Sequence, residues 1–334
     1  MTQTNLPLGD ERLQAELSTE LEEIERRLVE AARSTDRLVN TSAQHLLEAG
    51  GKRIRPVLVL LTSHLGSGIN DEVRTAAVAV ELTHLATLYH DDVMDSAPMR
   101  RGAPSAHEVW GNSVAILTGD LLFARASRLV ADLGPEAVLI EADAFERLVL
   151  GQLHESIGPA DGQDPIEHYL QVLADKTGSL IAASAQFGAM LSGAEEQVCA
   201  AVVAYAERVG VAFQLADDVI DLASDAATTG KTPGTDLREG VPTMPVLLLR
   251  RRERAGTLDE AGKALLADLD GDLSRDDVLA GVLARLREHD VVAEAREMAR
   301  AESAAAAAEL APLPSGVTKE AMEQFAHLLV DRLA

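Results

Sequence analysis

Apolar residues recur near the start of the chain at the spacing of one helix face. They step by four, four, three and four positions, as on one side of an amphipathic helix; these residues are Leu13, Leu17, Leu21, Ile24 and Leu28. A longer run of the same kind extends from about Asn70 to Asp95. The pattern therefore predicts two amphipathic helices within the first hundred residues.

The same periodicity continues along the chain, and glycine and proline mark the breaks between runs, as at Gly50-Gly51 and Gly134-Pro135. Convincing alternating strands are absent from the sequence. Further helices are predicted over about 113–132, 135–156, 178–191, 195–223, 244–252, 258–269, 276–289, 291–310 and 319–333. The predicted fold class is all-α.

Composition supports this prediction. Aromatic residues make up only 3% of the 334 residues, so the core must be aliphatic and rich in alanine, which favours helices over sheets. No linker separates two regions of different composition. We expect one helical domain over residues 11–334, preceded by a disordered N-terminus over residues 1–10. The single cysteine, Cys199, cannot form an intrachain disulfide and is expected to be a buried spectator.

The charge of the chain excludes several classes of partner. Lys and Arg number 30 and Asp and Glu number 54, so the formal net charge is −24. A nucleic-acid partner is not expected, because binding to phosphate polymers depends on basic patches. No signal peptide is visible, and no window reaches the roughly 18 consecutive apolar residues of a spanning helix. We expect a cytoplasmic protein without stable membrane insertion.

Two short segments carry the same arrangement of carboxylates. Asp91, Asp92 and Asp95 stand at positions i, i+1 and i+4 of one segment, and Asp217, Asp218 and Asp221 repeat the spacing in the other. Residues i and i+4 lie one above the other on a helix, so each motif presents two carboxylates to one point. A solvated acidic face is the alternative, but both motifs end apolar helices. A hard divalent cation with oxygen ligands best explains the pattern.

Basic residues accompany both motifs. Arg100-Arg101 follows the first motif, Lys231 follows the second, and Lys52, Arg53 and Arg55 cluster within Gly50–Pro56. Magnesium prefers phosphate oxygens together with one or two carboxylates. The pattern indicates a magnesium-dependent diphosphate site between two helices and a second anion site built from Lys and Arg.

At this point the sequence resembles the all-trans polyprenyl diphosphate synthases, of the bacterial medium- to long-chain type. The resemblance runs from about Gly50 to Pro245 and is specific because its motifs occur together and in order. They are Gly-Gly-Lys-Arg-Ile-Arg-Pro, His84 and His90 before the first aspartate motif, Arg100-Arg101-Gly102, Thr118-Gly119-Asp120, Lys176-Thr177, Phe213-Gln214 before the second motif, Gly230-Lys231-Thr232 and Gly234-Thr235-Asp236. It implies the isoprenoid synthase fold, a helical bundle around a central apolar cavity.

The resemblance also assigns roles to residues. Asp91, Asp95, Asp217 and Asp221 would ligate magnesium, three ions per active site, with Asp92 and Asp218 beside them. The ions would clamp an allylic diphosphate, whose pocket is completed by Arg100, Lys176, Thr177, Gln214 and Lys231. Isopentenyl diphosphate would bind without metal through Lys52, Arg55, His84 and Arg101. Arg53 is expected to face solvent, whereas Gln152 and Glu155 are expected to face the cavity.

The implied reaction is head-to-tail, all-trans chain elongation with release of diphosphate, in a homodimer. One alternative within the family is a geranylgeranyl or farnesyl diphosphate synthase. A class I terpene cyclase is less favoured, because cyclases usually carry a different second motif and lack the second anion site. A non-catalytic partner subunit would be expected to lose metal carboxylates, and all six are present.

Product length depends on the residues just before the first motif. In the resembled family, the residues four and five before the first aspartate border the cavity, and large aromatic side chains there give short products. Here they are Thr87 and Ala86, both small. We therefore expect a product of about six to nine isoprene units, because an aromatic side chain would otherwise block the cavity. Phe123 or Phe145 is a candidate for the floor, and the direction of Tyr89 is left open.

Overall fold

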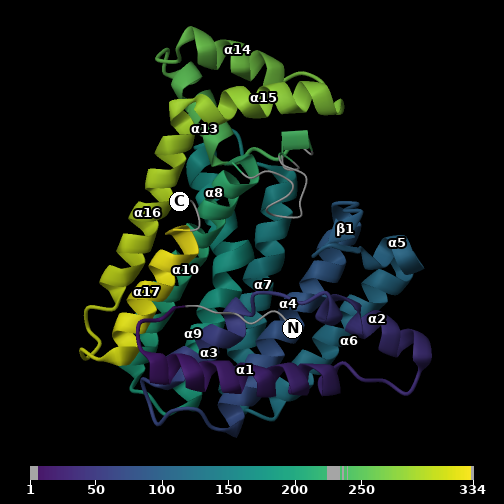
Figure 1. The fold of residues 1–334 in the computed structure, drawn as a ribbon, viewed down its shortest axis with the longest axis vertical. Helices are drawn as coiled ribbons and strands as arrows, with labels where there is room; N and C mark the ends of the chain where they lie inside the picture. Colours follow the sequence, from purple (N-terminus) through teal and green to yellow (C-terminus); the bar gives the residue numbers. More distant parts are fainter. Residues whose placement is uncertain (1–6, 224–233, 235–236, 239, 332–334) are drawn as a thin grey trace.

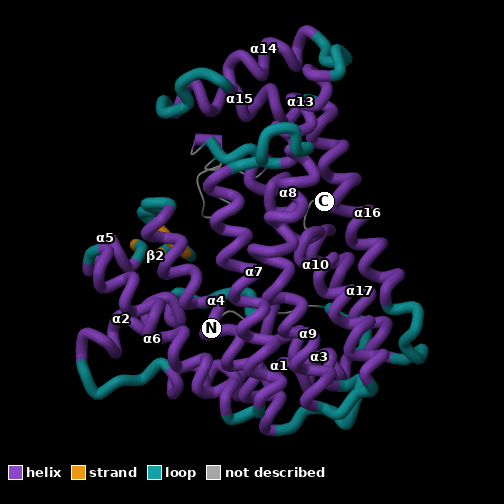
Figure 2. The backbone as a smooth tube through the Cα atoms, turned by 180° about the vertical axis from the view of Figure 1, so that it is seen from behind, coloured by secondary structure: helices purple, strands orange, loops and turns teal. Residues whose placement is uncertain are grey.

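The computed structural model describes residues 7–223, 234, 237–238 and 240–331. Nearly all regular structure in this part of the chain is helical, as the sequence predicts (Figure 2). The exception is a two-stranded hairpin of β1 (Met99–Arg100) and β2 (Ala103–Pro104). Its strands have two residues each, which is too short to leave an alternating pattern in the sequence.

The first half of the fold contains seven helices. They are α1 (Glu11–Ala31), α2 (Arg37–Glu48), α3 (Ile54–Ser63), α4 (Asp71–Met94), α5 (Ala106–Trp110), α6 (Asn112–Ala131) and α7 (Pro135–Ile157). Side-chain oxygens cap several of their N-termini, including Asp10, Asp36 and Asn70, each accepting a hydrogen bond from a backbone N–H of the first turn. These caps explain why the helices begin where they do.

The second half is built around one long helix, α10 (Glu196–Ala223). The others are α8 (Pro165–Leu173), the π-helix η1 (Ala174–Gly178), α9 (Ser179–Leu191), α13 (Met244–Arg254), α14 (Glu260–Leu269), α15 (Asp276–Glu288), α16 (Asp290–Glu309) and α17 (Val317–Asp331). In Figure 1, α1 crosses one end of the molecule, whereas α14 and α15 cover the opposite end.

Helix α10 packs against α9 and α16 in the middle of the bundle (Figure 1). Over Glu196–Leu222 it is long and apolar enough to cross a membrane, and it is the one such helix among the described residues. A helix that is apolar on several sides is also what the core of a large helical protein requires. Its position between α9 and α16 accounts for its composition.

The buried apolar residues form two clusters. The larger one joins α1–α4, α6 and α9 with the first half of α10, for example Val202 and Tyr205. The smaller one joins α8, α13–α16 and the second half of α10, for example Leu215 and Val219. The two predicted aspartate motifs therefore belong to different parts of the core, because α4 contributes to the larger cluster and the end of α10 to the smaller one.

Candidate active site

The first aspartate motif closes helix α4. Asp91 and Asp95 lie one turn apart, and the backbone N–H of Asp95 donates to the carbonyl of Asp91, 2.8 Å away. Asp92 is fully buried, and its Oδ1 accepts a hydrogen bond from Arg100 Nε at 2.6 Å. The motif therefore divides into two outer carboxylates for the site and a middle carboxylate that ties α4 to the hairpin.

The outer carboxylates of this motif share one electrostatic environment. Burial raises the pKa of Asp91 to about 6, against the opposing effect of Lys176, while the negative charge of Asp95 adds to the increase. Burial likewise raises the pKa of Asp95, and Lys176 again opposes the shift. Carboxylates whose ionised form is disfavoured in this way are good sites for an added positive charge.

The lysine whose charge acts on these carboxylates lies in a π-helix. Lys176 and Thr177 both belong to η1. Lys176 Nζ lies 2.5 Å from Glu155 Oε2 on α7, and Thr177 Oγ1 lies 3.4 Å from Gln214 Oε1 on α10. The structure thus brings together Asp91, Asp95, Lys176 and Glu155, and it places Thr177 beside Gln214.

The second aspartate motif lies near the end of α10, where Asp217 and Asp221 are one turn apart. Asp218 is buried, and its Oδ2 accepts hydrogen bonds from Tyr169 Oη at 2.6 Å and from the backbone N–H of Met244 at 3.2 Å. Met244 begins α13, so the Asp218 carboxylate also satisfies a donor at a helix N-terminus. Lys231, predicted to accompany this motif, lies outside the described residues.

The predicted second anion site assembles at the start of α3. Burial lowers the pKa of the Arg55 guanidinium to about 10, which leaves it charged at neutral pH, and within the described part of the chain its buried Nε has no hydrogen-bond partner. Burial, reinforced by Arg55 and Arg101, lowers the pKa of His84 well below its ordinary value, so its imidazole is neutral. A buried cation with an unsatisfied donor is suited to an anionic group.

The β1–β2 turn carries Arg101 into this site. Arg101 and Gly102 have φ values of 53° and 78°, the left-handed conformation that two-residue hairpin loops favour. Arg101 Nη1 donates to the backbone carbonyls of Gly50 and Leu46. A Cβ at Gly51 would lie 2.8 Å from Arg101 Nη1. Glycine at that position therefore lets the guanidinium approach the loop before α3.

The prediction that Arg53 faces solvent is wrong. Arg53 is 5% exposed and forms ion pairs with Glu25 on α1 and with Glu81 on α4, the latter at 2.8 Å. Burial lowers the pKa of Arg55 and of Arg101, and the negative charge of Glu81, itself 1% exposed, opposes both shifts. The two glutamates therefore offset the charge of a crowded group of arginines.

Lys52 connects this anion site to the second half of the fold. Its Nζ lies 5.9 Å from the centroid of the Phe213 ring on α10, within range of a cation–π interaction. Phe213 directly precedes Gln214. The two predicted substrate sites are thus adjacent, since the same stretch of α10 contacts residues of both.

The carboxylates fit a metal that is held partly by a substrate. Among the described residues, no three His, Cys, Asp or Glu side chains are placed to hold a metal ion by themselves. Each motif instead offers an outer pair of oxygen-donor groups, which is the number that magnesium commonly takes from a protein when phosphate oxygens and water complete its shell. The donor set suits this ion.

The residues predicted to set product length are also buried. Ala86 is 1% exposed, and Thr87 donates its hydroxyl to the carbonyl of His84 on its own helix. Tyr89 points toward α2, where its hydroxyl donates to the carbonyl of Ser42. Phe123 and Phe145 stack with centroids 4.0 Å apart, which joins α6 to α7. Tyr89 therefore supports α2, and the two phenylalanines support each other.

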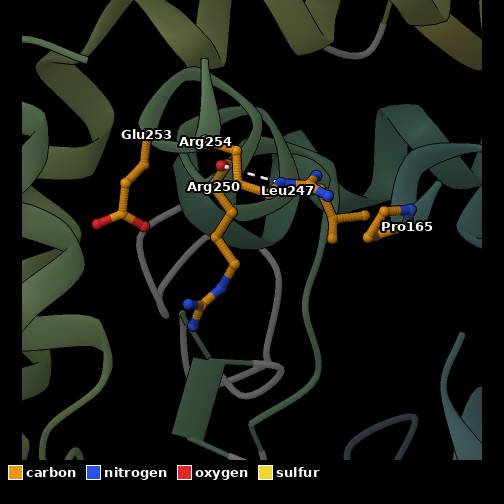
Figure 3. A pocket seen from close by; sticks show the side chains of 5 residues that line it. All are labelled: Pro165, Leu247, Arg250, Glu253 and Arg254. Atoms are coloured by element: carbon orange, nitrogen blue, oxygen red, sulfur yellow. Dashed lines mark hydrogen bonds between the residues drawn. The ribbon is translucent and has the colours of Figure 1, made fainter. Parts of the chain in front are cut away.

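A surface pocket of about 280 Å³ lies between α8 and α13 (Figure 3). It is lined by Pro165 at the start of α8 and by Leu247, Arg250, Glu253 and Arg254 of α13. Arg250 also pairs with Asp270, 2.6 Å away. None of the predicted site residues that the structure describes lines this pocket.

Some residues that hold the site in place belong to none of the motifs predicted from the sequence. Tyr169, Glu81 and Arg147 are the main examples, through their contacts with Asp218, Arg53 and Asp175 respectively. Each contact joins residues at least 28 positions apart. An isolated charged side chain in an apolar stretch of helix, such as Glu81 in α4, is the signal that the sequence contains, whereas Arg147 stands among other charged residues of α7.

The chain is similar to known proteins over nearly its whole length. A family model described as polyprenyl synthetase matches residues 36–268. The nonaprenyl diphosphate synthase of Mycobacterium tuberculosis is 43% identical, with 97% of this chain and 96% of the relative covered.

Two solved structures extend the similarity to the fold. The geranylgeranyl pyrophosphate synthase of Corynebacterium glutamicum, in complex with calcium and isoprenyl diphosphate, has 42% identity and a TM-score of 0.84, covering 97% of this chain and 98% of that one. The polyprenyl synthase of Caulobacter crescentus, also solved with calcium and isoprenyl diphosphate, has 31% identity and a TM-score of 0.86. The match covers 97% of this chain and 98% of that one. These similarities confirm the predicted all-α fold class and the predicted family.

Proposed function

The chain belongs to the polyprenyl synthetase family and is a prenyltransferase, and from this premise we propose how its residues divide the reaction. An allylic diphosphate binds between the two aspartate motifs, and isopentenyl diphosphate binds at Lys52, Arg55, His84 and Arg101. Head-to-tail condensation joins the two substrates and releases diphosphate. The rest of the proposal follows from the contacts at these two sites.

On the allylic side, Asp91, Asp95, Asp217 and Asp221 would hold magnesium ions, which supply positive charge to the departing diphosphate when bound. The relatives solved with calcium and isoprenyl diphosphate support a divalent cation here, and three ions per site is our proposal. Lys176, Thr177, Gln214, Arg100 and Lys231 would donate to the diphosphate oxygens. Such donors stabilise charge where it develops as the carbon–oxygen bond breaks.

On the other side, Arg55 and Arg101 would bind a diphosphate that does not leave. The double bond of isopentenyl diphosphate then attacks the allylic carbon, a new carbon–carbon bond forms, and the carbon skeleton loses one proton. The released diphosphate is the base we propose, because neutral His84 lies among arginines that disfavour its protonation. Apolar helix faces around the site would exclude water from the cationic carbon.

One observation carries this proposal: an arginine-rich site lies beside a carboxylate-rich site that contains one lysine. Arg55 presents a buried, unsatisfied Nε in one, and Lys176 stands against Asp91 and Asp95 in the other. A class I cyclase needs only the second of these sites. Release of diphosphate should therefore require both substrates, whereas release from the allylic substrate alone would identify a cyclase, and no release would identify a partner subunit.

Arg55→Ala separates the two sites. We expect it to raise the KM for isopentenyl diphosphate with a smaller effect on kcat, because it removes binding of a group that does not react. Lys176→Ala should act on the allylic substrate instead. Equal effects of both variants on the same substrate would contradict the two-site assignment.

We propose a product of about six to nine isoprene units, because Ala86 and Thr87 leave room that an aromatic side chain would fill. The 43% identical nonaprenyl synthase supports a long product, and a geranylgeranyl product is the alternative suggested by the Corynebacterium protein. Chromatography of the products formed from labelled isopentenyl diphosphate decides between them. Ala86→Phe should shorten the product while turnover persists; an unchanged distribution would show that Ala86 does not border the chain.

We also propose a homodimer formed through α6 and α7. Of the fourteen large hydrophobic side chains that are exposed among the described residues, eight lie on these two helices; they are Ile116, Leu117, Val138, Leu139, Val149, Leu150, Leu153 and Ile157. A second copy would cover such a surface, which monomers rarely leave exposed. Leu117→Glu with Leu139→Glu should give monomers by light scattering at micromolar concentration; Val317→Glu, at an exposed position that begins α17, is the control.

A further inference from the structure

The π-helix η1 requires support from its surroundings. It spans Ala174–Gly178 and carries both Lys176 and Thr177. A π-helix forms hydrogen bonds between residues i and i+5, one residue further apart than in an α-helix. Such turns are rare, and they frequently lie at functional sites. The contacts around η1 therefore decide where these two side chains point.

Two neighbouring helices approach the backbone of η1 at glycine residues. A Cβ at Gly151 on α7 would lie 2.6 Å from the backbone nitrogen of Lys176, and a Cβ at Gly210 on α10 would lie 2.5 Å from the Cα of Gly178. Larger residues at either position would push η1 away. The π-helix is thus seated between α7 and α10 with its backbone against theirs.

One guanidinium links the same three elements. Arg147, one turn before Gly151 on α7, donates from Nε to Asp175 Oδ1 at 2.9 Å and from Nη1 to Glu207 Oε1 on α10. The other carboxylate oxygen of Asp175 accepts from Gln171 Nε2 on α8, 2.8 Å away. Both carboxylate oxygens of Asp175 therefore accept hydrogen bonds. Asp175 directly precedes Lys176, the residue that acts on the first aspartate motif.

From this geometry we infer that Arg147 is a positioning residue for the prenyl transfer reaction: it holds η1 in the register that directs Lys176 and Thr177 to the allylic diphosphate. The inference rests on the proposed function, which places these two residues against that diphosphate. The planar guanidinium can bind two carboxylates in fixed directions, whereas a lysine ammonium cannot reproduce this fork.

The location of Arg147 distinguishes positioning from general stabilisation. The ion pairs of Arg147 are partly exposed, and one of them holds Asp175, which directly precedes the proposed site residue Lys176 and is 14% exposed. Arg208 on α10 offers a matched control, because it also bridges two acidic side chains, Glu302 and Glu309, and its exposure of 42% is close to the 37% of Arg147. Neither of its partners adjoins a proposed site residue.

The test compares Arg147→Met with Arg208→Met, since methionine retains an apolar stem and removes the guanidinium. For Arg147→Met we expect about a tenfold loss of kcat/KM for the allylic substrate, in line with the cost of misplacing a binding group by a fraction of an ångström. The KM for isopentenyl diphosphate should stay within about twofold of wild type. Arg208→Met should leave both substrates unaffected.

Asp175→Asn provides a second route should Arg147→Met fail to fold. It preserves the shape of the side chain and removes the charge that Arg147 binds. We expect the same selective loss of kcat/KM for the allylic substrate. The double variant, Arg147→Met with Asp175→Asn, should lose no more than the more damaging single variant, because both changes break the same contact. Arg147→Lys should recover little of the loss.

Lys176→Ala separates failure of this inference from failure of the proposed function. If it raises the KM for the allylic substrate while Arg147→Met and Asp175→Asn do not, the positioning role is overturned and the proposed function stands. If Lys176→Ala leaves the allylic substrate unaffected, the proposed role of Lys176 is itself wrong. Equal losses for both substrates in Arg147→Met would also overturn the inference, since they would report general destabilisation.

Discussion

In the first aspartate motif the middle carboxylate, Asp92, is held by the charged side chain of Arg100, whereas in the second motif Asp218 is held by a tyrosine hydroxyl and a backbone N–H. Asp92 belongs to a helix of the larger core cluster, and Asp218 to the part of α10 that packs in the smaller one. The same spacing of residues is therefore anchored in two different ways.

The difference shows what each anchor contributes. An ion pair that includes a fully buried carboxylate depends on both charges, because either one alone would remain buried without compensation. Neutral donors stabilise a carboxylate less strongly but impose less cost when one of them is lost. We therefore expect the first motif to lose more stability when the Arg100 side chain is removed than the second motif loses when the Tyr169 hydroxyl is removed.

The largest expected effect is common to the two motifs. Asp91→Ala and Asp217→Ala should each lower kcat by about a hundredfold or more, because each removes an outer carboxylate from the proposed metal site and with it charge stabilisation in the transition state. Steady-state turnover across a magnesium titration measures this loss. Magnesium-dependent activity close to wild type in either variant would contradict the proposed site.

The ion pair at the middle residue of the first motif should control stability. Arg100→Met should lower the free energy of unfolding by about 3 kcal/mol, the lower end for breaking a buried ion pair, because the fully buried Asp92 carboxylate would lose its charged partner while burial continues to raise its pKa. Urea unfolding measures the change. Arg238→Met is the control, because Arg238 pairs with Asp276, which is 90% exposed, and exposed pairs contribute less than about 1 kcal/mol. Equal losses in the two variants would contradict the distinction.

A smaller loss is expected in the second motif. Tyr169→Phe removes the hydroxyl that donates to Asp218 and should lower the free energy of unfolding by about 1.5–2 kcal/mol, as for a hydrogen bond to a charged group. Tyr205→Phe is the matched control, because the Tyr205 hydroxyl is also buried and donates to a neutral carbonyl, that of Met322, at 2.6 Å. If Tyr205→Phe lowers the free energy of unfolding by more than Tyr169→Phe does, then the charge of Asp218 does not strengthen its hydrogen bond with Tyr169.

The smallest effect concerns a buried acid within the larger cluster. Glu141 on α7 accepts a hydrogen bond from Thr83 on α4 at 3.1 Å, and burial raises its pKa above the ordinary value of 4.5. The Glu141 carboxyl therefore binds its proton more tightly in the folded protein than in the unfolded chain. Its contribution to the free energy of unfolding is present below pH 4.5 and is lost as pH rises through the pKa of the folded protein. Glu141→Gln removes the ionisation and keeps the acceptor.

Unfolding curves at several pH values test this prediction. The stability advantage of Glu141→Gln over wild type should be least near pH 4 and should widen toward pH 8. An advantage that stays constant with pH, or one that narrows as pH rises, would show that ionisation of Glu141 does not contribute.

The helices and the aspartate motifs could be predicted from sequence because both depend on local spacing. A helix repeats every 3.6 residues, so the buried face of α1 and the stacking of Asp91 on Asp95 are visible in the order of residues. The burial of Arg53 could not be predicted in this way, because it depends on Glu25 and Glu81 of two other helices. The π-helix is likewise held by α7 and α10 rather than by its own residues.

The division of α10 between two clusters has a consequence for how the protein opens. Local unfolding proceeds in cooperative units that follow the packing of the core. Amide protons around Val202 and Tyr205 should exchange with solvent only when the larger cluster opens, whereas those around Leu215 and Val219 should exchange with the smaller one. The second aspartate motif lies on the latter part of the helix, so heating should abolish catalysis at a temperature where most of the helical signal persists.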